Sequence, residues 1–307
     1  MKLVPVCAFL LVTSLVAGAP RLDYRSVSGA LSDGRIGWRA WTEAGEPRLL
    51  VVDPATLVVS VVSGGVEELS SRPAGTTIWD RLRTGAHQRR AGLQNAGVRR
   101  AQPARAGAWL TFDLCPSSHP LDRSLFTDLE PDATPLPVFL EVSGRWVETH
   151  GQDLAWLIAE RDAGRLAITW VNHTENHFYK PGVPLDQNFL LLPGTDLETE
   201  VFDVEKDLLD RGEMPSVFFR FPGLVSSPDL VDKVLALGLV PLGSSAWLAK
   251  QQFVKTGAIV LTHANGNEPE GLGLLEKWDH GHRSDLTDGT WHWLGLEDWA
   301  QAVIPAL

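Results

Sequence analysis

The sequence predicts an α/β fold built on a parallel sheet. From about residue 106 onward, strand-like and helix-like segments alternate along the chain, which is the pattern of repeated βαβ units. Most of these strands are continuous apolar runs, as expected when both faces of a sheet are covered. A hydrophobic fraction of 44% and a charged fraction of 21% in 307 residues are typical of a globular chain.

Residues 1–19 have the pattern of a secretory signal peptide. Lys2 is followed by an apolar run from Leu3 to Val16 and by small residues. The run falls short of the roughly 20 residues that span a bilayer. Cys115 is then the only remaining cysteine, so no intramolecular disulfide can form. We expect a secreted or periplasmic bacterial protein with no stable membrane insertion after cleavage; an uncleaved anchor is the alternative.

Residues 20–105 form a separate β-rich and Arg-rich segment. Strands are predicted at Leu49–Val52 and Leu57–Val62, with a turn begun by Asp53-Pro54. A basic stretch runs from Arg81 to Arg105, for which a solvated loop or frayed helix competes with a contact to an acidic envelope polymer. The net charge of −11 argues against a nucleic-acid partner.

The segment 106–307 carries the alternating elements and is predicted to be one domain. Strands are expected at Ala108–Asp113, Leu136–Val142, Leu166–Val171, Val217–Phe221, Leu239–Leu242 and Ala258–Thr262. Apolar periodicity and capping residues predict helices at Gln152–Ala163, at Leu197–Asp210, after Ser227-Pro228-Asp229 and at Leu296–Ile304.

Polar side chains lie at the end of five of these strands or just after it. They are Asp113; Asn172, His173 and His177; Arg220; Ser244 and Ser245; and His263. Parallel strands bring their carboxyl ends to one edge of the sheet, where such folds place their chemistry. The position of these polar residues at the ends of successive strands therefore predicts one shared site.

The residues at two of these strand ends suggest particular chemistry. His173 and His177 are four residues apart, and helical pitch would put both imidazoles on one face, where they could bind one cation. Zinc is the expected divalent metal, with cobalt or nickel as alternatives; a pair of surface histidines is the competing interpretation. Arg220 lies among phenylalanines, which favours a buried arginine paired with a carboxylate.

The strings TFD at 111–113, NHTENH at 172–177, FFRFPG at 218–223 and LTH at 261–263 resemble the motifs of the NodB-homology polysaccharide deacetylases, carbohydrate esterase family 4. GSSAWLAK at 243–250 is similar to a weaker motif of that family. The resemblance implies a distorted (β/α) barrel that removes N- or O-acetyl groups from an acetylated polysaccharide or peptidoglycan with a divalent metal. It also implies a role for each motif residue: Asp113 as base, Arg220 holding that base, His263 as acid, and His173 and His177 as metal ligands.

The sequence departs from the family pattern at two positions. Leu114 occupies the place of a metal-binding aspartate, and Ser245 stands near the place of an aspartate that tunes the acid histidine. Leucine cannot bind a cation, so another residue must complete the site or the metal is lost; the candidates are Asp113, His119, Asp122 and Glu175. We expect an exported carbohydrate deacetylase. A glycan-binding pseudoenzyme is the alternative, and a structural envelope protein a third possibility.

Two further features have competing interpretations. Twelve tryptophans suggest platforms for sugar rings, although core packing is the more ordinary role; those near the motifs are Trp170, Trp247, Trp278, Trp291 and Trp293. The string Asp279-His280-Gly281-His282 is expected to be an exposed loop, with a second metal site as the alternative. No GxSxG elbow, Gly-rich phosphate loop or Cys/His pair for thiol catalysis is found.

Overall fold

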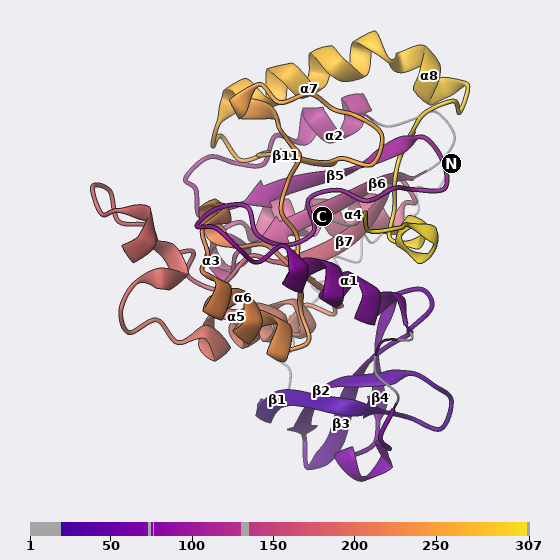
Figure 1. Ribbon diagram of the computed structural model, residues 1–307, viewed down its shortest axis with the longest axis vertical. Coiled ribbons are helices and arrows are strands. Elements are labelled where there is room, and N and C mark those ends of the chain that lie inside the picture. The colour runs from indigo at the N-terminus through magenta and orange to yellow at the C-terminus, as the bar shows by residue number, and fades with distance from the viewer. Residues whose placement is uncertain (1–19, 73–74, 76, 130–134, 306–307) are drawn as a thin grey trace, which may run out of the picture.

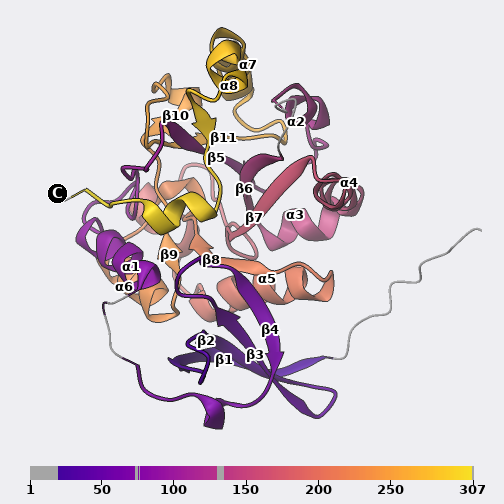
Figure 2. The same ribbon diagram turned by 90° about the vertical axis from the view of Figure 1, so that its right-hand side faces the viewer.

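The computed structural model describes residues 20–72, 75, 77–129 and 135–305. Within these residues a curved parallel sheet forms the centre of the molecule, and helices surround its outer face (Figure 2). In spatial order its strands are β10 (Ala246–Trp247), β11 (Ile259–Thr262), β5 (Gly107–Leu114), β6 (Leu136–Val142), β7 (Leu166–Asn172), β8 (Pro215–Phe219) and β9 (Val240–Pro241), with β12 (His292–Trp293) pairing with β5. This arrangement confirms the expected α/β fold of distorted barrel type.

The connecting helices begin where the sequence provides caps. The side chains of Ser143, Asp196 and Ser227 each accept a backbone N–H at the start of a helix. The helices are α2 (Arg123–Leu129), α3 (Gly144–Thr149), α4 (Gly151–Asp162), α5 (Leu197–Asp210), α6 (Pro228–Ala236), α7 (Pro269–Gly281) and α8 (Arg283–Thr287). Short 3₁₀ turns are η1 (Val66–Glu68), η2 (Leu185–Gln187), η3 (Phe189–Leu191), η4 (Pro222–Leu224) and η5 (Leu248–Lys250).

Strand β5 shows how the sheet separates its two faces. Successive side chains point to opposite faces of a strand. Leu110, Phe112 and Leu114 belong to the apolar cluster that includes residues of α2, α3, α4 and α7, whereas Trp109 belongs to the other large cluster. Trp109, Thr111 and Asp113 therefore lie on the inner, concave face, which is apolar at the start of the strand and polar at its end.

The amino-terminal end of the barrel is closed by the end of the chain. The predicted helix Leu296–Ile304 is only the 3₁₀ turn η6 (Glu297–Gln301), so that prediction was wrong. The backbone is extended at Ala302, and Val303 pairs with Gln102. Trp299 is fully buried and stacks on Trp109 at 4.1 Å between ring centroids. The contact between Trp299 and Trp109, rather than the helical periodicity of the sequence, therefore decides the conformation of this segment.

The first strands form a small antiparallel sheet beside the barrel (Figure 1). They are β1 (Arg21–Ala30), β2 (Ile36–Glu43), β3 (Glu46–Val52) and β4 (Val59–Ser63). The two predicted strands of this region correspond to β3 and β4, and the Asp53 side chain accepts N–H groups within the turn between them. A buried ion pair of 2.7 Å joins Arg39 on β2 to Glu205 on α5. Tyr24 also donates to Glu205, so α5 anchors the small sheet.

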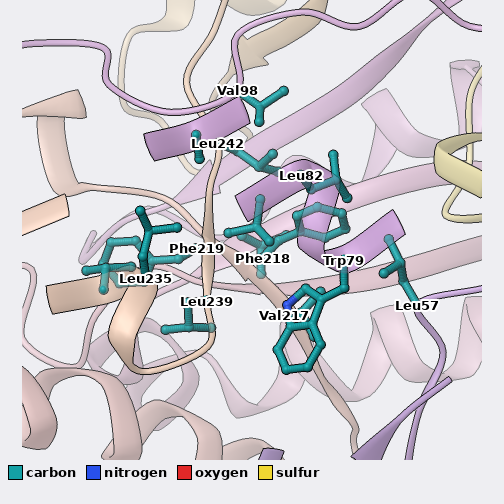
Figure 3. Packing of buried hydrophobic residues seen from close by; sticks show 14 of the residues in the cluster. Leu57, Trp79, Leu82, Val98, Val217, Phe218, Phe219, Leu235, Leu239 and Leu242 are labelled. Atoms are coloured by element: carbon teal, nitrogen blue, oxygen red, sulfur yellow. The ribbon is translucent and has the colours of Figure 1, made fainter. Parts of the chain in front are cut away.

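The Arg-rich stretch is more ordered than a solvated loop. It starts within helix α1 (Ile78–Gln88), which a reciprocal Thr77–Asp80 capping box stabilises. Trp79 and Leu82 pack among Val217, Phe218 and neighbouring residues of the large cluster (Figure 3). Residues 89–106 then run as an arm that makes isolated bridges to four other parts of the chain. The expectation of a frayed helix was therefore wrong, because α1 has a buried apolar face.

The described helices are all too short or too polar to cross a lipid bilayer. The predicted signal peptide, residues 1–19, lies outside the described residues.

Candidate functional site

Asp113 and Arg220 form the centre of the polar site. Asp113 is the second-last residue of β5 and is 4% exposed; Arg220 is fully buried. Strand β8 ends at Phe219, one residue before Arg220 and earlier than predicted. The Arg220 guanidinium donates to Asp113 Oδ1 at 2.7 Å and to Thr111 Oγ1 at 2.8 Å. These bonds orient the carboxylate and leave Oδ2 facing His173.

A second buried carboxyl group, which sequence reasoning missed, lies beside this pair. Glu141 on β6 is directly across from Asp113 in the sheet register and is fully buried. Its nearest oxygen is 3.5 Å from Arg220 Nη2, and neither carboxyl oxygen has a hydrogen-bond partner. Burial raises the pKa of Glu141 well above its ordinary value despite the Arg220 guanidinium, and the Asp113 carboxylate adds to the rise. Burial therefore favours the neutral form of Glu141.

His173 is held in one tautomer by the backbone. It follows β7, is fully buried, and its Nδ1 lies 2.9 Å from the carbonyl oxygen of Arg220. A carbonyl oxygen only accepts hydrogen bonds, so Nδ1 carries the proton. Burial lowers the pKa of His173 to about 3, so the ring is neutral and Nε2 carries a lone pair rather than a proton. That nitrogen lies 3.7 Å from Asp113 Oδ2.

His177 completes the pair, though not by the expected helical geometry. Thr174 and His177 have φ values of 69° and 46°, so the loop after β7 is not helical. The ring centroids of His173 and His177 are nevertheless 4.7 Å apart. Burial lowers the pKa of His177 to about 3, and its buried Nε2 has no hydrogen-bond partner. A loop with two residues in the left-handed conformation, and not the turn of a helix, therefore brings the two imidazoles together.

Cys115 is a third donor beside the two imidazoles, and sequence reasoning overlooked it. Within the described part of the chain, one group of metal-ligating side chains stands out: Cys115, His173 and His177, whose donor atoms lie within 4.8 Å of one another. Burial raises the pKa of the Cys115 thiol well above its ordinary value. Neutral buried imidazoles and a thiol suit a divalent transition metal, so the residues present fit the metal that the resemblance implies. The period of two along β5 was the available signal, because it places Cys115 on the same face as Asp113.

The structure explains why position 114 does not contribute a ligand. Leu114 is fully buried among apolar side chains of the outer face, directed away from the histidines. The other proposed substitutes lie elsewhere: His119, Asp122 and Glu175 are not part of the donor group. Glu175 has a buried carboxyl oxygen without a partner, and burial raises its pKa to about 7.

His263 follows β11 and has a carboxylate neighbour that the sequence did not reveal. Glu268 Oε2 lies 3.3 Å from His263 Nδ1 and accepts a 2.7 Å hydrogen bond from Trp247 Nε1. Although burial opposes the change, contacts with His263 and Trp247 lower the pKa of Glu268. Ser245, near the position of the expected aspartate, instead lines a different hollow. Glu268 thus provides the negative charge that this position lacks.

An open cavity of about 630 Å³ brings these groups together. Asp113, Cys115, His177, His263 and Glu268 all line it. His173 and Arg220 are buried behind Asp113, through the contacts described above. Four aromatic side chains form much of the remaining wall: Phe178, Tyr179, Phe189 and Trp247. Phe178 and Tyr179 are substantially exposed.

The tryptophans mostly serve packing. Trp170 and Trp293 are buried at 3% and 5% exposure, and Trp278, Trp291 and Trp293 pack against one another with tilted or edge-to-face rings. Trp247 alone of the five singled out in the sequence lines the cavity. The second histidine string was wrongly expected to be an exposed loop, because Asp279–Gly281 lies in the last turn of α7. His282 stacks on Trp278, and the described residues of that string form no metal-ligand group.

The Arg-rich arm borders a second hollow of about 1060 Å³. Its lining includes four arginines and no carboxylate: Arg89, Arg99, Arg100 and Arg105. Two of these already have partners, since Arg105 pairs with Asp298 and Arg89 donates to backbone carbonyls. A contact between this arm and an acidic polymer stays a prediction.

Comparison with solved structures identifies the fold. A family 4 carbohydrate esterase from Bacillus anthracis aligns with a TM-score of 0.50 and 19% identity, over 74% of this chain and 93% of that one. The fold is that of the family 4 carbohydrate esterases. A family 4 esterase from Streptomyces lividans solved with acetate (TM-score 0.44, 16% identity, 64% and 96% covered) and a family 4 pseudoenzyme from B. anthracis (0.44, 13%, 87% and 86%) also match.

No family model matches the sequence. At 19% identity the likeness to the family 4 esterases establishes the fold, and the reaction has to be argued from the site. The carboxyl ends of the strands, where a barrel places its catalytic groups, are also where this chain gathers Asp113, His173, His177 and His263.

Proposed function

We propose that the chain is an exported carbohydrate deacetylase that hydrolyses N- or O-acetyl groups of a cell-envelope or extracellular glycan. One observation carries the proposal. A carboxyl group fixed by a buried arginine lies 3.7 Å from one of two neighbouring neutral histidines, and a third histidine, 3.3 Å from the Glu268 carboxylate, lines the same cavity. This combination supplies a proton acceptor, cation ligands and a proton donor within reach of one acetyl group.

Each side chain has a distinct task in the proposed reaction. Asp113, held by Arg220, accepts the proton of the attacking water through the oxygen that Arg220 leaves free. His263, whose Nδ1 lies 3.3 Å from Glu268 Oε2, donates a proton to the departing amine or alkoxide. Burial favours the neutral form of Glu141, and Asp113 is the carboxyl group that Arg220 holds by a hydrogen bond.

His173 and His177 would hold the divalent metal. A bound zinc polarises an acetyl carbonyl and lowers the pKa of its water to about 7. The Arg220 carbonyl keeps the proton of His173 on Nδ1, which presents Nε2 to the cation without a change of tautomer. Both rings are neutral before the metal arrives, so they bind it without first losing a proton.

A glycan-binding pseudoenzyme is the second candidate, and the replaced residues at positions 114 and 245 favour it. Two observations weigh against it. Cys115 and Glu268 introduce a metal donor and a histidine partner from neighbouring positions. A binding module would not need an arginine-held carboxylate that faces a histidine pair. We therefore place the enzyme first.

Acetate release tests the proposal directly. The full chain, loaded with zinc, is incubated with acetylated chitin oligosaccharides and with acetylated peptidoglycan fragments, and free acetate is measured. His263→Gln is the matched control, since it keeps the size of the side chain roughly constant and removes the proton donor. Release by the wild type and a loss of about 10²- to 10⁴-fold in the variant are expected. Binding of these glycans without acetate from any of them would establish the pseudoenzyme.

Export is a separate part of the proposal and rests on residues 1–19. Expression in a bacterial host, followed by fractionation and amino-terminal sequencing, should recover a shortened protein in the periplasm or medium. A full-length protein retained in the membrane fraction would favour the uncleaved anchor.

A further inference from the structure

Cys115 occupies the inner face of the barrel one step beyond Asp113. It is 8% exposed and lies just after β5, where alternation of side chains places positions 113 and 115 on one face. Its carbonyl oxygen accepts a 2.7 Å hydrogen bond from Asn265, which fixes the backbone at this point. The sulfur therefore has a defined position at the wall of the cavity.

The spacing of the donor atoms suits a tetrahedral cation. Cys115 Sγ lies 3.5 Å from His173 Nε2. Zinc binds sulfur at about 2.3 Å and nitrogen at about 2.0–2.1 Å, so tetrahedral angles would separate the two donors by about 3.6 Å. A ring nitrogen of His177 lies within 4.8 Å of the other two donors, and the buried Nε2 of this ring has no hydrogen-bond partner. The Cys115–His173 pair thus already has the spacing of two zinc donors, and His177 lies close enough to join them.

We propose that Cys115, as a thiolate, is the third protein ligand of the metal and takes the place of the carboxylate that position 114 lacks. The inference rests on the proposed function only for the presence of a metal at the histidine pair. When the cation binds, the Cys115 thiol gives its proton to solvent and the sulfur forms the new bond. Asp113 stays bound to Arg220 and remains free to accept a proton.

A thiolate ligand changes which metals the site prefers. Sulfur is a soft donor that favours zinc and cobalt, whereas oxygen-rich sites suit magnesium, calcium and manganese. A site of one sulfur and two imidazole nitrogens leaves a fourth position for water or substrate, the arrangement of catalytic zinc sites. We therefore expect zinc and cobalt to bind and magnesium to compete poorly.

Cobalt spectroscopy distinguishes Cys115 from Asp113 as the third ligand. The full chain is stripped of metal under reducing conditions and titrated with Co²⁺ while absorption is recorded. A near-ultraviolet sulfur-to-cobalt charge-transfer band is expected in the wild type. It should persist in Asp113→Asn and in Cys7→Ser, the matched control for the other cysteine, and disappear in Cys115→Ser. Zinc affinity should fall about 100-fold or more in Cys115→Ser and recover partly in Cys115→Asp.

The outcomes separate this inference from the proposed function. Cobalt binding without a sulfur band, together with weaker binding in Asp113→Asn, would make Asp113 the ligand and overturn the role of Cys115. Acetate release by a protein that lacks the band would also overturn it and leave the deacetylase standing. A sulfur band in a protein that releases no acetate would support Cys115 and remove the deacetylase. The band is read in the wild type, so the result does not depend on the folding of a variant.

Discussion

Arg220 is a buried cation with two carboxyl neighbours, at 2.7 Å for Asp113 and 3.5 Å for Glu141. We predict that these two neighbours substitute for each other. In the Asp113→Asn variant, Glu141 loses a negative neighbour that helps to raise its pKa. Glu141 should then ionise and pair with Arg220, so the fold keeps one anion beside the buried guanidinium.

The expected magnitudes follow from these contacts. Asp113→Asn removes a charge-assisted hydrogen bond and should lower the free energy of unfolding by about 1.5–3 kcal/mol. Glu141→Gln removes a neutral group without hydrogen bonds and should cost about 1 kcal/mol or less. The double variant leaves Arg220 without an anion, and an unpaired buried charge costs about 3–5 kcal/mol. The double loss should therefore exceed the sum of the single losses by about 1–3 kcal/mol.

Urea unfolding of the four proteins at pH 7, with chelator present, measures this coupling. The control is a double-mutant cycle that combines Glu141→Gln with the distant Asp80→Asn. The losses in unfolding free energy of these two variants should add within about 0.5 kcal/mol. If the Asp113–Glu141 cycle is equally additive, Glu141 does not replace Asp113 and the assigned protonation states are wrong. Activity provides a second readout: Asp113→Asn should lose acetate release by about 10²- to 10⁴-fold, and Glu141→Gln should retain it.

Three other predictions concern the neighbouring groups. Glu268→Gln should lower the turnover of acetate release by up to about 10²-fold with KM unchanged, because Glu268 acts through His263; an equal rise in KM would indicate a substrate contact instead. Leu114→Asp should destabilise the fold by roughly 3 kcal/mol or more in thermal or urea unfolding, because the new carboxyl group would face apolar residues. Zinc affinity should stay unchanged in this variant. Tighter zinc binding would contradict the assignment of Leu114 to the outer face of β5. A hydrogen bond from Arg72 lowers the pKa of Asp80, so Asp80 contributes stability above its ordinary pKa of about 3.9 that is lost at lower pH. Urea unfolding should show that Asp80→Asn lowers the free energy of unfolding at pH 7. The difference in this free energy between wild type and variant should shrink below about pH 4, whereas a difference that is constant with pH would exclude this linkage.

Much of the fold was predictable from local sequence. The apolar runs of β5, β6 and β7 and the helices α4 and α5 were expected within one or two residues of their observed bounds, and the capped start of α6 was expected where it lies. Strands with both faces covered are apolar throughout, and helices with one covered face are periodic. These signals are local, so they survive in a single sequence.

The last helix was not predictable in the same way. Residues 296–304 have helical periodicity, but the segment is held as a 3₁₀ turn by the burial of Trp299 against Trp109, nearly 200 positions earlier in the chain. The string at Asp279–Gly281 failed in the opposite direction: a glycine between histidines suggested a loop, yet it falls in the final turn of α7, where the helix ends. Packing outweighed propensity in both cases.

The sequence by itself determined the α/β class and the positions of Asp113, His173, His177, Arg220 and His263 at strand ends. Only the tertiary structure decided which neighbours complete them. Cys115, Glu141 and Glu268 reach the site because parallel strands bring distant segments to one edge, and because alternate residues of a strand face one side. Adjacent positions on a strand face opposite ways, so the apolar Leu114 is compatible with a complete donor set at the histidines.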